Sequence, residues 1–234
     1  MCSSDLPGEY VFASRLFVTR GDSLVVWDDA LGRASVLSPA GEHARDLVPD
    51  AQLASPRLAG VFGDGSLLIV NPTLDLAPGT SIQTQRGEDI RFDPEGKGLD
   101  TLGLYPGRTA QLLKDGVPVT DFAPQDMVSI REVPFSAETQ RAVDGGGYWV
   151  GTTATRQIEY HDSTGALKTI VRWTGGPLDV TDQDKQSYVN ERITAAKDDQ
   201  ERASLRANGV AGFEVAPTLP THGPLLVDAR SAEH

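Results

Sequence analysis

Histidines that could ligate a metal are the first candidates for chemistry in this chain. His43, His161 and His222 lie far apart in the sequence, and no two of them have the short spacing of a typical zinc site. Metal ligands come in sets, and these three residues do not form a set along the chain. We therefore expect each of them to be a polar surface residue.

A short acidic cluster, Asp179, Asp182 and Asp184, has the side-chain chemistry that calcium prefers. The loop lacks the glycine at the sixth position and the acid at the twelfth position that an EF-hand requires. Acidic residues are also favourable at the start of a helix, where the first N–H groups carry partial positive charge. We interpret the cluster as the beginning of a helix.

The residues at 21–24, Gly-Asp-Ser-Leu, spell the nucleophile motif of the GDSL esterases, whose serine lies between a strand and a helix. The residues that follow favour a strand instead, and no Asp-x-x-His pair occurs further along the chain. Ser23 is therefore predicted to lie in a turn, and the same turn explains the integrin-like Arg20-Gly21-Asp22. The glycines at 145–147 also indicate a turn, because a strand follows them and a phosphate loop needs a helix.

The composition limits the partners of the chain. A formal net charge of -12 and a pI near 4.7 disfavour nucleic acid, which needs clustered Lys and Arg. No run approaches the roughly 20 apolar residues that cross a bilayer, so no transmembrane segment is expected. The expected partner is a protein or a small-molecule ligand.

Both ends of the chain are predicted to be non-native. Residues 2–6 match a translated sequencing adapter, and residues 230–234 resemble its opposite strand with one change. We expect residues 7–229 to be one domain and an internal fragment of a longer chain, with residues 1–6 and 230–234 outside it. The one cysteine, Cys2, then lies outside the native segment, which excludes disulfides and a cysteine nucleophile from it.

Three segments repeat the pattern of a β-hairpin: 35–47, 90–104 and 158–171. Gly41, Gly96 and Gly165 can supply the positive φ that a tight turn between two strands needs. A repeated unit of this size cannot bury its apolar face alone, so copies must stack on one another. The sequence thus predicts an all-β fold: a partial β-propeller of four-stranded antiparallel blades, with about three to four of six present.

The predicted blades lie near 14–50, 56–113 and 138–173, and another begins at 223–229 with a strand at 225–228. Strands are expected at 15–19, 24–27, 33–37, 43–47, 57–62 and 67–70, followed by a loop at 71–80. Trp27, Trp149 and Trp173 are expected in strands, where they would pack between blades. Within 106–138, residues 110–113 could extend the preceding strand, 115–116 could turn into a strand at 117–120, and 128–133 has the pattern of one more strand. The pattern does not assign these segments to a blade.

A helical insertion is predicted at 181–208. Thr181 and Asp184 have the form of a capping box, and Asn208-Gly209 gives a stop signal. Two helices broken near 197–199 are expected, with Tyr188, Ile193 and Ala196 on the face toward the sheets.

The strand and turn motifs resemble those of bacterial six-bladed β-propeller proteins of the NHL-like kind. The resemblance rests on Pro7-Gly8-Glu9-Tyr10, the 21–28 segment, Asp64-Gly65-Ser66-Leu67, Phe92-Asp93-Pro94-Glu95-Gly96, the 148–152 segment and the 223–228 segment. It implies a periplasmic or secreted location and a binding surface around a central channel.

Two functions are compatible with these features. The first is a non-enzymatic ligand- or protein-binding propeller without cofactor, in which Tyr188, Arg192 and His222 are the candidate contacts. The alternative is a metal-dependent hydrolase or lactonase of the six-bladed type, in which Asp, Glu and Asn would hold calcium or another divalent cation. No catalytic, cofactor-binding or metal-ligating residue is assigned from the sequence.

Overall fold

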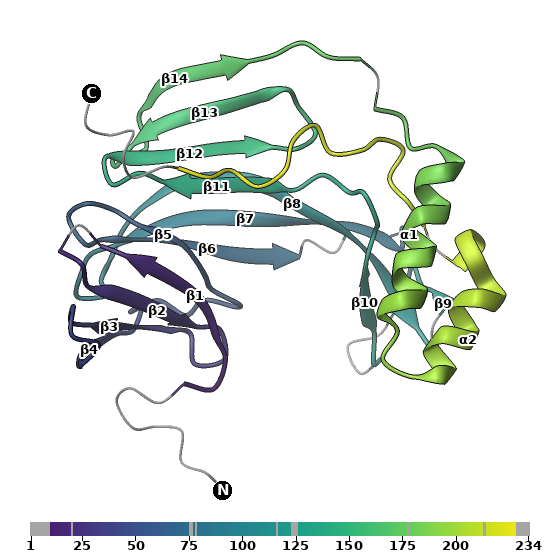
Figure 1. The fold of residues 1–234 in the computed structure, drawn as a ribbon, viewed down its shortest axis with the longest axis horizontal. Helices are drawn as coiled ribbons and strands as arrows, with labels where there is room; N and C mark the ends of the chain where they lie inside the picture. The colour runs from purple at the N-terminus through teal and green to yellow at the C-terminus, as the bar shows by residue number, and fades with distance from the viewer. Residues whose placement is uncertain are drawn as a thin grey trace, which may run out of the picture.

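The structure is a computed structural model of the chain. It describes residues 10–227 apart from residues 20, 75, 76, 78, 116, 123–125, 177 and 213. Three antiparallel sheets follow one another along the chain, and a pair of helices comes after the third sheet (Figure 1). The mostly β fold expected from the sequence is confirmed. The predicted non-native ends, residues 1–6 and 230–234, lie outside the described residues.

Each sheet places its strands side by side in chain order. The first sheet holds β1 (Ala13–Val18), β2 (Leu24–Asp28), β3 (Arg33–Leu37) and β4 (His43–Leu47). The second holds β5 (Arg57–Val61), β6 (Leu67–Leu74), β7 (Ile82–Phe92) and β8 (Gly98–Lys114), and both β9 (Val117–Pro118) and β10 (Ser129–Glu132) pair with β8. The third holds β11 (Thr139–Val143), β12 (Gly147–Thr152), β13 (Gln157–Asp162) and β14 (Leu167–Arg172).

The repeated hairpins close as their turn residues predict. Gly41, Gly96 and Gly165 have φ angles of 81°, 91° and 83°, which only glycine adopts without strain. In two of these turns an aspartate carboxylate also accepts backbone N–H groups: Asp93 from Glu95 and Lys97, and Asp162 from Thr164 and Ala166. The local sequence therefore fixes the hairpins before any packing between sheets.

Apolar side chains fill the two spaces between neighbouring sheets. The first and second sheets enclose a buried cluster of Val25, Trp27, Ala34, Leu47, Leu58, Leu67, Ile69 and Phe92. The second and third enclose Phe62, Leu68, Tyr148 and Val150. Gly60 of β5 allows the second and third sheets to approach closely, because a Cβ there would lie 2.4 Å from Cγ2 of Val143 in β11.

Hairpin turns of one sheet also form hydrogen bonds with the sheet that precedes it in the chain, or with the loop that follows that sheet. Gly96, in the β7–β8 turn, accepts the N–H of Asp50 at 2.9 Å, and the side chain of Asp50 accepts the N–H of Gly98 at 2.8 Å. Arg91 of β7 donates to the carbonyl of Ser163, in the β13–β14 turn, at 2.8 Å. The same relation thus joins the first sheet to the second and the second to the third.

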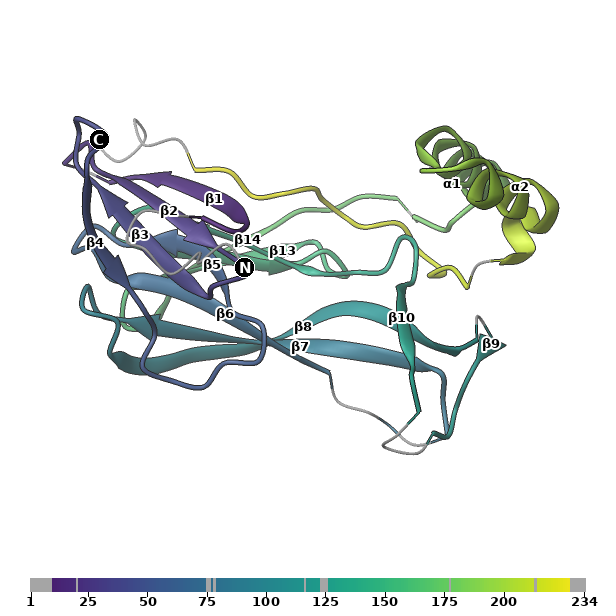
Figure 2. The same ribbon diagram turned by 90° about the horizontal axis from the view of Figure 1, so that it is seen from below.

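The region 106–138, which the sequence left unassigned, continues the second sheet. β6 runs on to Leu74, so the loop predicted at 71–80 is wrong for residues 71–74. The far ends of β7 and β8 reach beyond the other strands, and β9 and β10 pair with the end of β8 (Figure 2). We call residues 82–85 and 107–114, together with β9 and β10, the extension.

The helices begin and end where the capping residues predict. Thr181 and Asp184 form both hydrogen bonds of the capping box at the start of α1 (Asp182–Ala195). Asp198 caps α2 (Asp199–Asn208), and Gly209 ends it with a φ of 51°. Tyr188, Ile193 and Ala196 are half-buried as expected, and Val189 is the fully buried residue of α1.

The strand predicted at 225–228 is absent from the part of it that the structure describes. Residues 223–227 are irregular, because no neighbouring strand among the described residues pairs with them, and residue 228 lies outside those residues. Leu225 and Val227 line a small cavity together with Ala142 and Trp149 of the third sheet. Trp173 follows β14 directly and is not in a strand, since β14 ends at Arg172.

Candidate functional site

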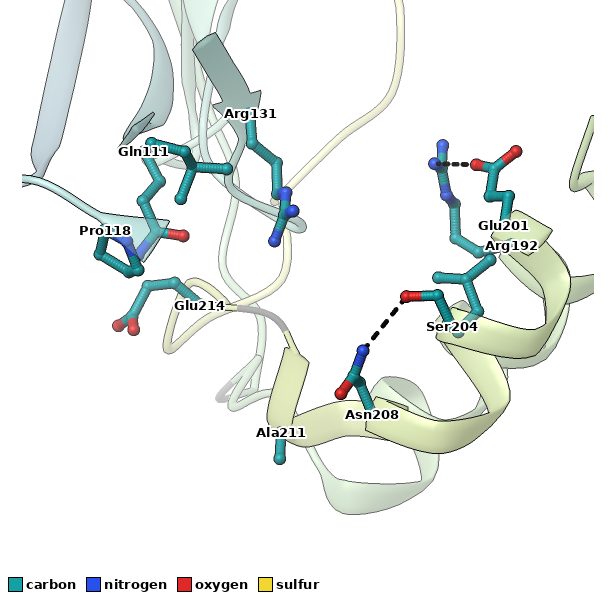
Figure 3. Close-up of a pocket in the computed structure, with 11 residues that line it drawn as sticks. Gln111, Pro118, Arg131, Arg192, Glu201, Ser204, Asn208, Ala211 and Glu214 are labelled. Atoms are coloured by element: carbon teal, nitrogen blue, oxygen red, sulfur yellow. Dashed lines mark hydrogen bonds and ion pairs between the residues drawn. The ribbon is translucent and has the colours of Figure 1, made fainter. Parts of the chain in front are cut away.

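The candidate site is a cavity of about 640 Å³ between the extension and the two helices (Figure 3). This volume lies within the range of small-molecule sites, roughly 300–1,000 Å³. The residues that line it come from both sides: Gln111, Leu113, Pro118, Arg131, Arg192, Glu201, Ser204, Leu205, Asn208, Ala211 and Glu214. Both walls lie outside the four-stranded arrangement that the three sheets have in common.

The strand wall is built by the pairing of β8 with β10 and β9. Gln111 lies directly across from Arg131, and Leu113 lies across from Pro118. Residues two apart on a strand share a face, so Gln111 and Leu113 both reach the cavity. The guanidinium group of Arg131 points from β10 toward the space between the walls (Figure 3).

Arg108 of β8 holds this wall in position. It donates to Glu132, at the end of β10, over 2.7 Å and also to Glu138, which precedes β11. The hydrogen bond that Arg108 donates to Glu138, and then the one it donates to Glu132, raise the pKa of Arg108 against the opposing effect of burial. The charge of Arg108 therefore ties the extension to the third sheet.

The helix wall presents one face of α2. Glu201, Ser204, Leu205 and Asn208 recur at the three- and four-residue spacing that places side chains on one side of a helix. Arg192 of α1 pairs with Glu201 at 3.3 Å, and the amide of Asn208 donates to the hydroxyl of Ser204 at 3.2 Å (Figure 3). The other oxygen of Glu201 accepts the N–H of Lys197 at 2.9 Å, which fixes the carboxylate at the break between the helices.

The chemistry of this lining favours binding over catalysis. Two arginines, two glutamates and the amide groups of Gln111 and Asn208 line the cavity, and side chains of these kinds can orient a polar ligand. Ser204 is the one hydroxyl among the lining residues, and its partner is an amide and not a base. The lining thus contains no activated serine.

The structure does not bring the three predicted contacts together. Arg192 lines the cavity, and Tyr188 lies on the same helix, where its ring meets the edge of Phe135 at 5.7 Å. His222 lies at the third sheet instead, with its ring 5.5 Å from that of Trp173. Both of its ring nitrogens are buried without a hydrogen-bond partner among the described residues, and burial lowers its pKa.

Sequence reasoning missed the strand wall and most of the helix wall. Gln111 belongs to the buried run 110–113 at the end of β8 and Arg131 to the exposed β10, and neither pattern marks a residue as part of a binding site. Glu201, Ser204 and Asn208 share a face that helical spacing alone could have shown. That the two walls meet is set by the fold and has no sequence signal.

A second polar cluster lies between the second and third sheets. Asp89 of β7 is 0% exposed, and Nε of Arg141 in β11 donates to its two oxygens at 2.7 and 2.8 Å. Burial raises the pKa of Asp89, although the charge of Arg141 opposes the rise. The ring of Tyr148 stacks on His161 beside this pair at 5.3 Å, and burial raises the pKa of the Tyr148 hydroxyl. The cluster joins the second sheet to the third.

The other motifs take structural positions. Ser23 accepts the N–H of Thr19 in the β1–β2 turn and is followed by a strand, as predicted. Arg20 lies outside the described residues, and the glycines at 145–147 form the turn into β12. Within the part of the chain that the structure describes, no three His, Cys, Asp or Glu side chains gather closely enough to hold a metal ion. None of the described helices has the length and apolar character needed to cross a membrane.

Comparison with models of known protein families gives no match to this chain, and no curated protein matches it either.

Proposed function

We propose that the chain is a non-enzymatic binding scaffold built as part of a β-propeller. Three antiparallel sheets that stack face to face in chain order support this reading: the first and third have four strands, and the second has β5–β8 with β9 and β10 added to β8. The resemblance to six-bladed NHL-like proteins of bacteria adds two further proposals: that more blades complete a ring, and that the protein is periplasmic or secreted.

We further propose that the extension–helix cavity is its recognition site. The observation that carries this proposal is that two separate insertions, the end of the second sheet and the α1–α2 pair, meet around one polar cavity of about 640 Å³. Binding residues commonly lie on loops and insertions that a rigid scaffold positions. A small polar ligand, held by the arginines and amides of both walls, fits this lining.

Calorimetric titration and thermal-shift assays with free amino acids, short dicarboxylates and inorganic phosphate test the proposal. We expect at least one of these probes to bind the wild-type chain. The Arg192→Ala variant should weaken that binding at least tenfold, because it removes a charged group from the cavity lining. The Tyr188→Ala variant should also weaken it, because the Tyr188 ring meets Phe135 and supports α1.

Arg172→Ala is the matched control, since Arg172 is exposed on β14 and does not line the cavity. It should bind the same probe with unchanged affinity. Binding that Arg192→Ala and Tyr188→Ala leave unchanged would place the ligand elsewhere. A chain to which none of the probes binds would contradict a small-ligand site.

A further inference from the structure

A short segment that follows the helices, residues 216–222, runs back across the third sheet, and we call it the strap (Figure 1). Both of its ends bind backbone groups outside it. Thr221 donates its N–H to the carbonyl of Thr153, in the β12–β13 turn, at 2.8 Å. Ala216 donates its N–H to the carbonyl of Pro134, which precedes β11, at 2.9 Å. The strap is therefore fixed to the third sheet by its backbone.

The middle of the strap pairs with the segment that leads into α1. Val180 donates its N–H to the carbonyl of Pro217 at 2.9 Å, and Leu219 donates its N–H to the carbonyl of Leu178 at 2.7 Å. Glu214, which lines the extension–helix cavity, precedes the strap by two residues. The strap thus ties together the two ends of the helix pair, and it links the helix wall of the cavity to the third sheet.

The imidazole ring of His222, the last residue of the strap, lies against the third sheet without a polar partner. Its centre is 5.5 Å from that of Trp173, and Gly151 of β12 leaves room for the ring, because a Cβ there would lie 3.3 Å from Nε2 of His222. Both ring nitrogens are buried and have no hydrogen-bond partner among the described residues. A buried charge without a partner costs far more than a buried neutral polar group, so protonation of His222 opposes the burial of its nitrogens.

The charged side chains of the elements around His222 do not compensate for a proton on its ring. Each of them is bonded elsewhere: Arg156 to the carbonyl of Gly176, Arg172 to Gln157, Glu138 to Arg108 and Gln140, and Glu159 to His161. Residues 215–227, all of which the structure describes, contain no titratable side chain besides His222. Burial is the cause that lowers the pKa of His222.

We propose that His222 is a pH-sensitive latch for the helix wall of the cavity: the neutral ring holds the strap on the third sheet, and protonation of the ring releases the strap. In the released strap the ring regains the ordinary histidine pKa of about 6.5, whereas burial keeps the pKa of the held ring lower. The released strap therefore binds the proton first, and its population rises as the pH falls below about 6.5. The consequence for ligand binding rests on the function proposed above, but the release of the strap does not depend on it.

Hydrogen exchange of the full chain at pH 7.5 and pH 5.5, corrected for the intrinsic exchange rate at each pH, tests the latch. We expect the opening of the amides of Val180, Leu219 and Thr221 to increase about three- to tenfold at pH 5.5, since one proton one pH unit below 6.5 allows at most about tenfold. His222→Phe keeps a ring beside Trp173 but cannot be protonated, so it should show no increase. His43→Asn, which changes a histidine of the first sheet, is the matched control and should keep the wild-type increase.

Three results of the exchange experiment would overturn the proposal. They are no increase in the wild-type chain, an equal increase in His222→Phe, or an increase of the same size in the strand at 147–152, which would indicate general unfolding. An NMR titration of the wild-type chain tests the latch without a variant. The ring signals of His222 should titrate below about pH 6.5, together with the amide signals of Leu219 and Thr221. A ring that titrates at about 6.5 while these amides stay unchanged would also contradict the latch.

The link to the cavity is tested with whichever probe, a free amino acid, a short dicarboxylate or inorganic phosphate, binds the wild-type chain at pH 7.5. The weakening of binding from pH 7.5 to pH 5.5 should be at least about threefold greater for the wild-type chain than for His222→Phe, because titration of the probe itself affects both chains equally. Equal weakening in the two chains would overturn the link between the strap and the cavity. If none of the probes binds, the proposed function fails, while the exchange experiment still decides whether His222 is a latch.

Discussion

Asp28 shows how a single residue organises the first sheet. Its side chain is 1% exposed, and it accepts the N–H groups of Val11 at 2.6 Å, Phe12 at 3.2 Å, Ala30 at 2.9 Å and Leu31 at 3.1 Å. Burial acts to raise the pKa of this carboxyl, but the four backbone donors outweigh burial and lower the pKa. A buried carboxylate with this many donors stabilises the fold only while it is ionised.

Asp28→Asn should therefore lower the free energy of unfolding at pH 7 by about 2 kcal/mol, as hydrogen bonds to charged groups contribute roughly 1.5–3 kcal/mol. A carboxyl whose pKa is lowered by folding stabilises the protein above its unfolded pKa of about 3.9 and stops doing so as the pH falls through the folded value. Urea unfolding from pH 7 to pH 3 should show the difference between wild type and variant shrinking below about pH 4. The exposed Asp100→Asn should show no such difference, and a gap that is independent of pH would contradict this role of Asp28.

The buried pair of Asp89 and Arg141 shows what the sequence does not reveal at this scale. The two residues are 52 positions apart and come from different sheets. Asp89 belongs to β7, a strand rich in polar residues, and from the sequence alone a charged residue there is expected to face solvent. In the structure Asp89 is fully buried. The partner that permits this burial is set by the stacking of sheets, and no local pattern reports it.

At the scale of elements, turns, caps and the strands of the extension were predictable, but the sheet to which those strands belong was not. The turn glycines and the Thr181 capping box act through neighbours within a few residues, so the local sequence is sufficient to predict them. β10 is exposed along its whole length, so no buried face indicates which sheet it joins. The segment at 225–227 has strand-forming residues but no described partner strand, and propensity without a partner gave the wrong answer there.

Arg108 gives the element-scale test. Arg108→Ala removes the contacts to Glu132 and Glu138, so the extension should open more often while the sheets stay intact. Global stability should fall by less than about 1 kcal/mol, since these pairs are partly exposed. Hydrogen exchange should become at least fivefold faster at residues 107–114 and 129–132 only. Arg45→Ala, in the first sheet, serves as the control. Unchanged hydrogen exchange of the extension in Arg108→Ala would show that Arg108 does not hold the extension in position.

At the scale of the whole molecule, three sheets stack face to face in chain order. The repeat in the sequence predicted that copies stack, but it could not say which residues meet. Gly60 and Val143 form a close contact between the second and third sheets. A Cβ on Gly60 would lie 2.4 Å from Cγ2 and 2.6 Å from Cβ of Val143. Residues this far apart along the chain touch only if the second and third sheets are neighbours.

A double-mutant cycle on Gly60→Ala and Val143→Gly, measured by urea unfolding, tests this stacking most directly. Gly60→Ala alone should cost about 1–3 kcal/mol, because the added methyl group overfills the space between β5 and β11. Val143→Gly removes the opposing Cβ together with its methyl groups, so the double variant should recover at least about 1 kcal/mol of the cost expected from the sum of the single changes. Effects that add within about 0.5 kcal/mol would show that the two residues do not meet and would contradict the stacked arrangement.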